Sequence, residues 1–233
     1  MKLAILDDDA DHNRLIAQTF AVEHDCICFD TVPGLLRYLQ RETIDLLILD
    51  WNLPSGSGLS VLTWARANLP SSLPVLMITS RSGDEDILSG FAAGADDYIV
   101  KPAQTTILKG RVEALLRRAY PPVETGGVET FGEHIFDVAR QSVRIGDAVI
   151  DLTAKEFQLA HLLFRNLSRA MSRGYLLERI WGLAPDLPTR TLDAHISRIR
   201  LKLQLRPQQG FRLSTVYSYG YRLEKLEQPE EAA

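Results

Sequence analysis

Groups that could do chemistry stand directly after short apolar runs in the first half of this 233-residue chain. The acids Asp7–Asp9 follow KLAIL, Asp50 ends DLLILD, Thr79 ends VLMIT and Lys101 follows YIV. If the runs are neighbouring parallel strands, their carboxyl ends meet at one edge of a sheet. The sequence therefore predicts that three carboxylates, a hydroxyl and an ammonium group converge there. An aspartate at a strand end is also a common helix cap, which is the role expected for Asp9.

Carboxylates gathered in this way repel one another, and a divalent cation with oxygen ligands offsets the repulsion, which favours Mg²⁺. A carboxylate beside a metal ion and a lysine is placed to attack a phosphoryl group in line. Any one of these residues alone would indicate little. Their occurrence at successive strand ends predicts phosphoryl chemistry with Asp50 as the nucleophile.

The apolar runs themselves predict the sheet that positions these groups. Between them lie helical patterns of ordinary length with start signals at Thr31, Ser57, Gly83 and Thr105. Five strand–helix units within residues 1–118 predict an α/β domain with a doubly wound five-stranded parallel sheet. The strand candidates are KLAIL, CICF, LLILD, PVLMITS and YIV.

The composition changes at AYPPVETGG, residues 119–127, which we expect to be a linker because two prolines and two glycines stop a helix. Residues 128–226 show short alternating segments, three helical patterns and a closing hairpin, which predicts an α+β domain. A capping box at Thr153–Glu156 opens the first helix. Residues 227–233 are expected to be a flexible tail.

Charge is distributed unevenly between the two halves. Residues 1–123 carry 16 acidic and 11 basic residues, whereas residues 165–222 carry 11 basic and 3 acidic ones. The basic stretch indicates nucleic acid as a partner of the second domain. No apolar run is long enough to span a membrane. Cys26 and Cys28 are expected to be reduced residues of a cytoplasmic protein.

The motifs of both halves resemble a known family. DDD at 7–9, LDWNLPSGSG around Asp50, MITS at 77–80 and GADDYIVKP at 94–102 resemble the flavodoxin-like receiver domain of bacterial two-component response regulators. LTAKEF, RGYLLERIWG, TRTLDAHISRIRLKL and TVYSYGYRL resemble the winged-helix DNA-binding domain of the OmpR/PhoB family. The resemblance implies a transcriptional regulator that catalyses only its own phosphorylation and dephosphorylation.

The resemblance also assigns the site residues of the first domain. Asp50 is implied as the phosphoacceptor for a sensor histidine kinase, and Mg²⁺ would be held by Asp7, Asp8, Asp50 and the Asn52 carbonyl. Thr79 would bond the phosphoryl group, Lys101 would pair with its charge, and the Lys101–Pro102 bond would be cis. Tyr98 matches an aromatic residue that changes rotamer with the threonine, although it could simply pack the sheet edge.

The third helical pattern of the second half is the expected DNA reader. Leu192, Ile196, Ile199 and Leu203 form a core stripe by their spacing. A solvated basic face is the plainer alternative, but the hairpin and the resemblance favour DNA. The DNA-contact candidates are Arg190, Thr191, Ala194, His195, Ser197, Arg198, Arg200 and Lys202 on the helix, with Tyr217 in the wing.

Further partners come from the resemblance alone. A homodimer of the phosphorylated form would use Asp97 with Arg111, Asp96 with Arg118, and isoleucines at 87 and 107 where relatives carry a charged pair. The loop 182–188 would face RNA polymerase, or serve only as a connector. Ala103, Tyr217 and Ser218 depart from the family pattern of Phe, Arg and Gly.

A phosphohydrolase is the rival hypothesis. The sequence faintly resembles haloacid-dehalogenase-like enzymes, through Asp7 and Asp9 after a first strand with Thr79 and Lys101 downstream. In such an enzyme, Asp7 would be the nucleophile. This alternative leaves Asp50 without a role and offers no cap domain for a small substrate. A DNA-binding protein with a vestigial receiver conflicts with the complete acidic site.

Overall fold

The computed structural model describes residues 1–54, 56–122, 127–182 and 189–226. By its internal contacts the chain divides into two compact units, residues 1–122 and 123–233. Among the described residues, no helix has the length and apolar character needed to cross a membrane.

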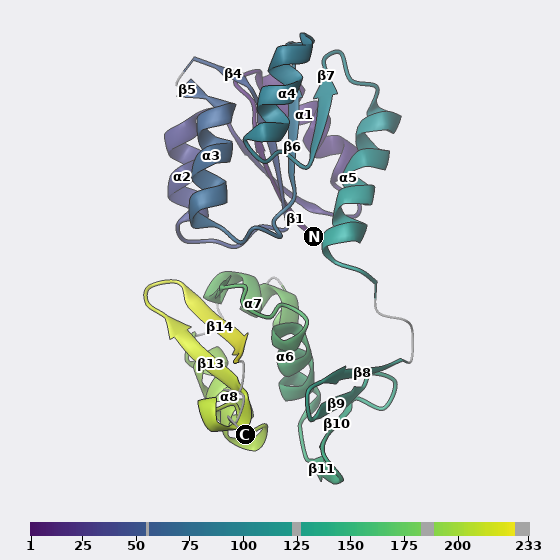
Figure 1. The fold of residues 1–233 in the computed structure, drawn as a ribbon, viewed down its shortest axis with the longest axis vertical. Helices are drawn as coiled ribbons and strands as arrows, with labels where there is room; N and C mark the ends of the chain where they lie inside the picture. Colours follow the sequence, from purple (N-terminus) through teal and green to yellow (C-terminus); the bar gives the residue numbers. More distant parts are fainter. Residues whose placement is uncertain (55, 123–126, 183–188, 227–233) are drawn as a thin grey trace, which may run out of the picture. The chain divides into compact units, whose positions relative to one another are not determined.

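The first unit is built on a five-stranded parallel sheet with the strand order β2-β1-β3-β6-β7 (Figure 1). The prediction of a doubly wound α/β domain is thereby confirmed. The strands are β1 (Lys2–Leu6), β2 (Asp25–Phe29), β3 (Leu46–Asp50), β6 (Val75–Thr79) and β7 (Asp97–Val100). The helices are α1 (Ala10–Phe20), α2 (Val32–Leu39), α3 (Gly58–Asn68), α4 (Asp84–Ala92) and α5 (Thr105–Ala119).

Helices cover both faces of this sheet. Successive strand residues point to opposite faces, so each strand contributes to both apolar clusters. Leu47 and Leu49 of β3 pack in one apolar cluster with α2 and α3, whereas Leu46 and Ile48 pack in another with α1 and α5. Full burial of the residues in β1, β3 and β6 explains why these three strands read as uninterrupted apolar runs. In β3, for example, all five residues from Leu46 to Asp50 are buried.

The predicted helix starts are met with one small shift. Asp9, Thr31, Ser57 and Gly83 are N-caps, and the Asp9 carboxylate accepts from the Asp11 and His12 backbone amides as a cap should. The last helix of the unit begins at Thr105 with Gln104 as its N-cap. A two-stranded ribbon of β4 (Asn52–Leu53) and β5 (Gly56–Ser57) between β3 and α3 was not predicted.

The second unit combines an antiparallel sheet, three helices and a hairpin. The sheet has the order β11-β10-β9-β8, and the hairpin strands join a short strand in the order β12-β14-β13. The first sheet holds β8 (Val128–Phe131), β9 (His134–Asp137), β10 (Ser142–Ile145) and β11 (Ala148–Ile150). Beyond it come α6 (Ala154–Phe164), β12 (Met171–Ser172), α7 (Arg173–Trp181), α8 (Thr189–Lys202), the 3-10 turn Pro207–Gln209, β13 (Phe211–Val216) and β14 (Gly220–Lys225).

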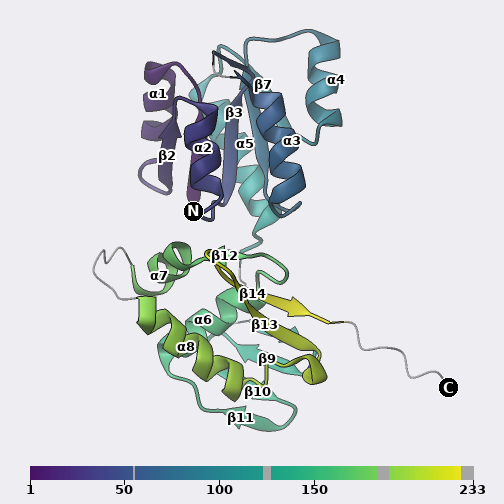
Figure 2. The same cartoon turned by 90° about the vertical axis from the view of Figure 1, so that its left-hand side faces the viewer.

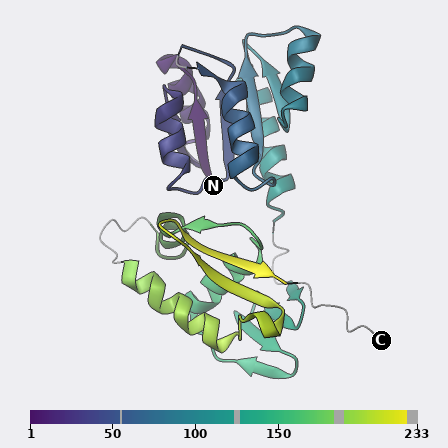
Figure 3. The same ribbon diagram turned by 60° about the vertical axis from the view of Figure 1, so that its left-hand side comes forward.

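The predicted apolar stripe of α8 packs into the core of this unit. Leu192, Ile196, Ile199 and Leu203 are all buried within the core cluster. Each such side chain contributes about 1.5–3 kcal/mol when removed from water. Helix α8 lies alongside the β13–β14 hairpin in two views (Figures 2 and 3), as a winged helix requires.

Two local features fix the ends of the helices in this unit. The capping box of α6 is present in both directions, with Thr153 and Glu156 exchanging hydrogen bonds, as predicted. The buried His134 ring bonds the Leu203 carbonyl at 2.8 Å and so joins β9 to the end of α8. Burial lowers the pKa of His134, which favours the neutral ring.

Candidate functional site

The carboxyl ends of the parallel strands bring the predicted groups together. Asp7 follows β1, Asp50 ends β3, Thr79 ends β6 and Lys101 follows β7. Asp7, Asp50 and Thr79 are buried, and Asp8 is exposed. Gly58 permits the chain to turn back against β3, since a Cβ there would stand 1.9 Å from the Asp50 carbonyl oxygen. The sheet topology thus builds a compact acidic site from residues far apart in the sequence.

Lys101 lies between two of the carboxylates. Its Nζ donates to Asp50 Oδ2 at 2.6 Å and to Asp7 Oδ2 at 2.8 Å. Burial alone would lower the pKa of Lys101, but the hydrogen bonds to Asp50 and Asp7 outweigh it and raise the pKa. The ammonium group is therefore firmly charged and neutralises part of the acidic cluster. The adjoining Lys101–Pro102 peptide bond is cis, as the resemblance implied.

The donor set fits a divalent cation. Carboxylate oxygens of Asp7, Asp8 and Asp50 lie within 4.8 Å of one another, and an ammonium group already sits against two of them. Clustered carboxylate oxygens are the ligands that Mg²⁺ prefers. Receiver domains bind this ion at a cluster of acidic residues.

Asn52 and the loop after β6 lie beside this cluster. The Asn52 side chain donates to Ser80 Oγ at 3.3 Å and accepts from Arg81 Nε at 3.0 Å. Arg81 also pairs with Asp86 of α4 at 2.9 Å, and its guanidinium lies over the Trp51 ring. Sequence reasoning missed Arg81. Its position two residues after the strand-end Thr79 was the available signal.

Tyr98 is turned inward in this structure. It is 7% exposed, packs near Trp51 and Phe91, and donates its hydroxyl to the Arg81 carbonyl at 2.9 Å. Tyr98 thus contacts the same loop that Thr79 begins, where the threonine hydroxyl accepts from the Arg81 amide at 3.2 Å. The plainer expectation of an edge-packing aromatic and the switch role are both compatible with this position.

On α8, the solvent face differs from the predicted set. Arg190, Ala194, Ser197 and Arg198 are exposed, whereas Thr191 and His195 are half-buried. His195 Nδ1 donates to the Thr191 carbonyl at 2.7 Å, and the ring packs edge-on against Trp181. Asp193 and Leu201, which were not selected as contacts, are also exposed.

Two of the predicted DNA contacts are engaged inside the second unit. Lys202 Nζ bonds Glu156 Oε2 at 2.8 Å, and Glu156 is 1% exposed. Arg200 Nε donates to the Leu213 carbonyl of β13 at 3.1 Å. These side chains fasten α8 to α6 and to the hairpin. The helical projection placed both beside the DNA-facing side, but the neighbouring elements hold them inward.

The tip of the hairpin carries an aromatic residue. Tyr217 is 94% exposed, and Ser218 adopts a left-handed φ of 56°. Below the tip, Tyr221 donates to Asp193 at 2.5 Å and stacks under the Arg173 guanidinium. The wing is therefore fixed to the start of α7 and to α8, with Tyr217 free of cover at its end.

The predicted dimer residues make ion pairs within the chain. Asp97 bonds Arg111 at 2.6 Å. Asp96 bonds Arg66 at 2.7 Å and accepts from the Val75 amide, so its carboxylate is already occupied. Ile87 packs partly into the sheet's core cluster, while Ile107 is 47% exposed. Arg118 is exposed.

The comparisons with known proteins cover both units. Residues 3–113 match the family model of the response regulator receiver domain, and residues 147–223 match that of the C-terminal domain of transcriptional regulatory proteins. The chain is 38% identical over 195 residues to the sensory transduction protein RegX3 of Mycolicibacterium smegmatis, covering 82% of this chain and 85% of that protein. It belongs to the OmpR/PhoB family of response regulators.

The regulator is also similar to two other proteins. The phosphate regulon transcriptional regulatory protein PhoB of Escherichia coli is 36% identical over 180 residues, covering 76% of this chain and 77% of PhoB. The solved structure of response regulator DrrB from Thermotoga maritima is 29% identical, covers 96% and 98% of the two chains, and has a TM-score of 0.48.

Membership of this family decides between the hypotheses from the sequence. The chain is a receiver joined to an OmpR/PhoB-type DNA-binding domain, and it is a transcriptional regulator. The haloacid-dehalogenase-like alternative has no support. Asp9, which that alternative needs, caps α1 through the Asp11 and His12 amides. Residues 183–188 of the expected polymerase loop, residues 123–126 of the predicted linker and the tail at 227–233 lie outside the described residues.

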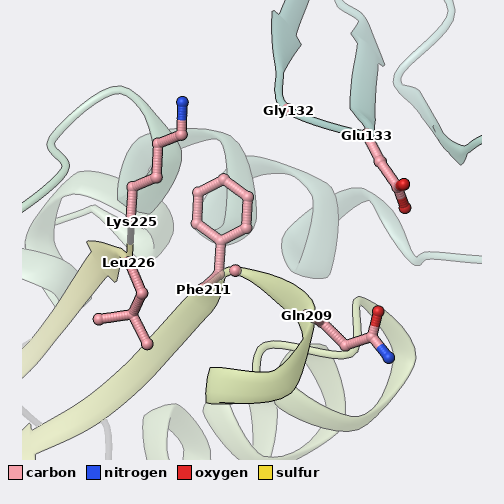
Figure 4. A pocket seen from close by; sticks show the side chains of 7 residues that line it. Gly132, Glu133, Gln209, Phe211, Lys225 and Leu226 are labelled. Carbon is pink, nitrogen blue, oxygen red and sulfur yellow. The ribbon is translucent and has the colours of Figure 1, made fainter. Parts of the chain in front are cut away.

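A surface hollow of about 540 Å³ lies elsewhere in the response regulator's second unit (Figure 4). It is lined by the β8–β9 turn, by the start of β13 and by the end of β14, with Glu133 and Lys225 bringing opposite charges to it. None of the residues selected from the sequence lines it. It is separate from the exposed face of α8 and from the wing tip.

Proposed function

We propose that Asp50 accepts a phosphoryl group from the phosphohistidine of a sensor histidine kinase. One Asp50 carboxylate oxygen bonds to phosphorus as the P–N bond of the donor breaks, and the imidazole leaves. The single observation that carries this proposal is the buried Asp50 carboxylate paired with Lys101 at the shared strand edge. Lys101 supplies positive charge where the phosphoryl oxygens arrive.

Mg²⁺ would be held by Asp7, Asp8, Asp50 and the Asn52 carbonyl. When bound, the ion neutralises charge on the transferring phosphoryl oxygens. The regulator then catalyses nothing beyond its own phosphorylation and dephosphorylation. It acts in the cytoplasm, where the kinase domain and promoter DNA meet it.

The effect of phosphorylation at Asp50 would be transmitted to α4 through the loop after β6. Thr79 begins this loop, Tyr98 bonds its Arg81 carbonyl, and the Arg81 guanidinium pairs with Asp86 of α4. The Thr79 hydroxyl can donate to the phosphoryl group while it accepts from the Arg81 amide, so it would link the phosphoryl group to this loop. The loop, Tyr98 and α4 therefore move together.

The proposal is tested by incubating the regulator with acetyl phosphate and Mg²⁺. Intact-mass and peptide mass spectrometry should find one added phosphoryl group, located on Asp50. DNA affinity, measured on a selected operator, should rise with the phosphorylated fraction. Label on another residue, or DNA affinity independent of the label, would contradict the proposal.

DNA readout is expected to depend on the exposed face of α8. Arg198 is exposed and central on that face, and an arginine there can bond a guanine with two hydrogen bonds in the major groove. Arg198→Ala should weaken cognate binding by about 1–3 kcal/mol and relax specificity at one base pair. Binding isotherms on cognate and random duplexes measure this. Equal losses on both duplexes would remove Arg198 from the base-reading residues.

Dimerisation of the phosphorylated form would use an apolar face on α4, β7 and α5. Its exposed members are Leu88, Phe91, Val100 and Ile107. Ile87, partly packed in the core, contributes less to this face than the sequence indicated. Burial of apolar area yields about 25 cal/mol per Å² and depends little on salt, unlike exposed ion pairs.

Ile107→Lys should therefore raise the dissociation constant of the phosphorylated dimer at least about tenfold, a cost of roughly 1.4 kcal/mol. Sedimentation equilibrium across a salt series measures it. Val22→Lys is the matched control, since Val22 is 97% exposed on the turn after α1. An unchanged dimer constant for Ile107→Lys would remove this face from the proposal. The loop 182–188 remains a proposed contact for RNA polymerase.

A further inference from the structure

A histidine stands against the acidic site. His12 lies in the first turn of α1, and its Nδ1 is 2.5 Å from Asp7 Oδ2. The two side chains are largely enclosed, with 18% of the His12 side chain and 3% of the Asp7 side chain exposed. No role was assigned to His12 from the sequence.

The chemistry of the pair fixes the direction of this hydrogen bond. An ionised carboxylate only accepts hydrogen bonds, so Nδ1 of His12 carries the proton and donates a hydrogen bond to Asp7. Burial would raise the pKa of Asp7, but the hydrogen bonds from His12 and Lys101 outweigh it and lower the pKa. The geometry of the pair thus makes the Asp7 carboxylate the acceptor of the His12 ring proton.

The donors to Asp7 are of two kinds. The Asp9 amide donates to Oδ1 at 3.0 Å and His12 donates to Oδ2, and both come from the chain segment that starts α1. Lys101, in contrast, is shared with Asp50. When Lys101 turns to a phosphoryl group on Asp50, the Asp9 amide and His12 remain to hold the Asp7 carboxylate.

His12 contacts one ligand, Asp7, and is not itself a member of the ligand group. The ligand atoms within 4.8 Å of one another belong to Asp7, Asp8 and Asp50, and the His12 ring is outside this group. A hydrogen bond from a neighbouring side chain orients a ligating carboxylate, and loss of such a bond typically weakens metal affinity.

We propose that His12 is a positioning residue of the Mg²⁺ site, which orients the Asp7 carboxylate toward the ion through its Nδ1–H. This inference rests on the proposed function, since it assumes that Asp7 is a metal ligand. It predicts a contribution to metal affinity that any side chain with a donor at the same place can supply.

The experiment is an equilibrium titration with Mg²⁺ in the absence of any phosphodonor, followed by tryptophan fluorescence. Trp51 is the neighbour of both Asp50 and Asn52, so it reports occupancy without phosphoryl transfer. His12→Leu and His12→Ala, which lack a donor, should raise the Mg²⁺ dissociation constant about tenfold or more. His12→Asn should restore nearly the full affinity, because the amide nitrogen stands the same number of bonds from Cβ as Nδ1.

The controls separate this inference from the proposed function. His24→Leu removes a histidine near the other end of α1 and should leave the dissociation constant unchanged. Asp8→Asn should weaken binding by removing a ligand. If wild type itself shows no saturable Mg²⁺ response, the metal site of the proposed function is wrong. If wild type binds Mg²⁺ and His12→Leu binds equally well or better, or His12→Asn loses as much as His12→Leu, the role of His12 is overturned.

Discussion

Asp50→Asn is expected to abolish phosphoryl uptake while the receiver stays folded. The asparagine side chain has the shape of the aspartate and can still accept from the Asn52 amide, which lies 3.1 Å from Asp50 Oδ1. Lys101 keeps its second partner, Asp7. Loss of one negative charge from a crowded acidic site also relieves repulsion. What disappears is the anionic oxygen that bonds to phosphorus.

Mass spectrometry after incubation with acetyl phosphate and Mg²⁺ measures the uptake, and thermal unfolding without Mg²⁺ measures the fold. The melting temperature of Asp50→Asn should equal or exceed that of wild type. Asp9→Asn is the matched control, because asparagine caps a helix about as well as aspartate and Asp9 only caps α1. Asp9→Asn should still take label. Label on Asp50→Asn equal to wild type would show that another residue is the acceptor.

Much of the receiver was predictable because its central strands β1, β3 and β6 are buried on both faces. Uninterrupted apolar runs such as LLILD mark such strands, and a parallel sheet then brings their carboxyl ends together whatever the loops do. The ribbon β4–β5 was missed because its residues lie in a Pro-, Ser- and Gly-rich segment with no alternation. Strand β8 (VETF) was missed because it is short and half polar.

His12 and Arg81 show what the strand-end argument leaves out. Both lie just beyond the strand ends, where position depends on how the chain turns. For His12 a signal existed, since it lies three residues after the N-cap Asp9 and helical side chains tilt toward the N-terminus. For Arg81 the only signal was its position two residues after Thr79, because its contacts with Asn52 and Trp51 cross between loops and cannot be read from the local sequence.

The helical projection of α8 was accurate for the core and incomplete for the flanks. Spacing alone identified the buried stripe and the exposed Arg198. It could not show that Glu156, 46 positions away, draws Lys202 inward, or that a carbonyl of β13 captures Arg200. Periodicity describes one helix, whereas the partners of its flanking residues belong to other elements.

Lys202→Met is accordingly expected to act on stability and not on DNA contacts. Glu156 is buried, and its Oε2 accepts from both the Lys202 ammonium and the Thr153 amide, the latter at 3.0 Å. Removing the ammonium leaves a buried carboxylate without its counter-charge. Such losses cost about 3–5 kcal/mol for fully buried pairs, and since Lys202 is one-third exposed we expect about 2 kcal/mol.

The partner substitution provides a double-mutant cycle. Glu156→Gln removes the charge but keeps the capping box, because glutamine serves at this position as glutamate does. The double variant Lys202→Met with Glu156→Gln should therefore recover most of the stability lost in Lys202→Met alone. Urea unfolding of the full chain, followed through the second unit's transition, gives the four free energies. Arg206→Met is the control, since Arg206 is exposed beyond α8.

Two further measurements separate the ion pair from a phosphate contact. Burial would raise the pKa of Glu156, but the bond from Lys202 outweighs it and holds the pKa below the ordinary 4.5. The unfolded chain therefore takes up the proton first, so the ion pair's stabilisation is present above about pH 4.5 and fades as pH falls through the folded pKa. In DNA binding, loss of a phosphate contact would reduce the salt slope by about 1, whereas loss of an internal pair leaves it unchanged. A Lys202→Met variant of unaltered stability and lower salt slope would return Lys202 to the DNA interface.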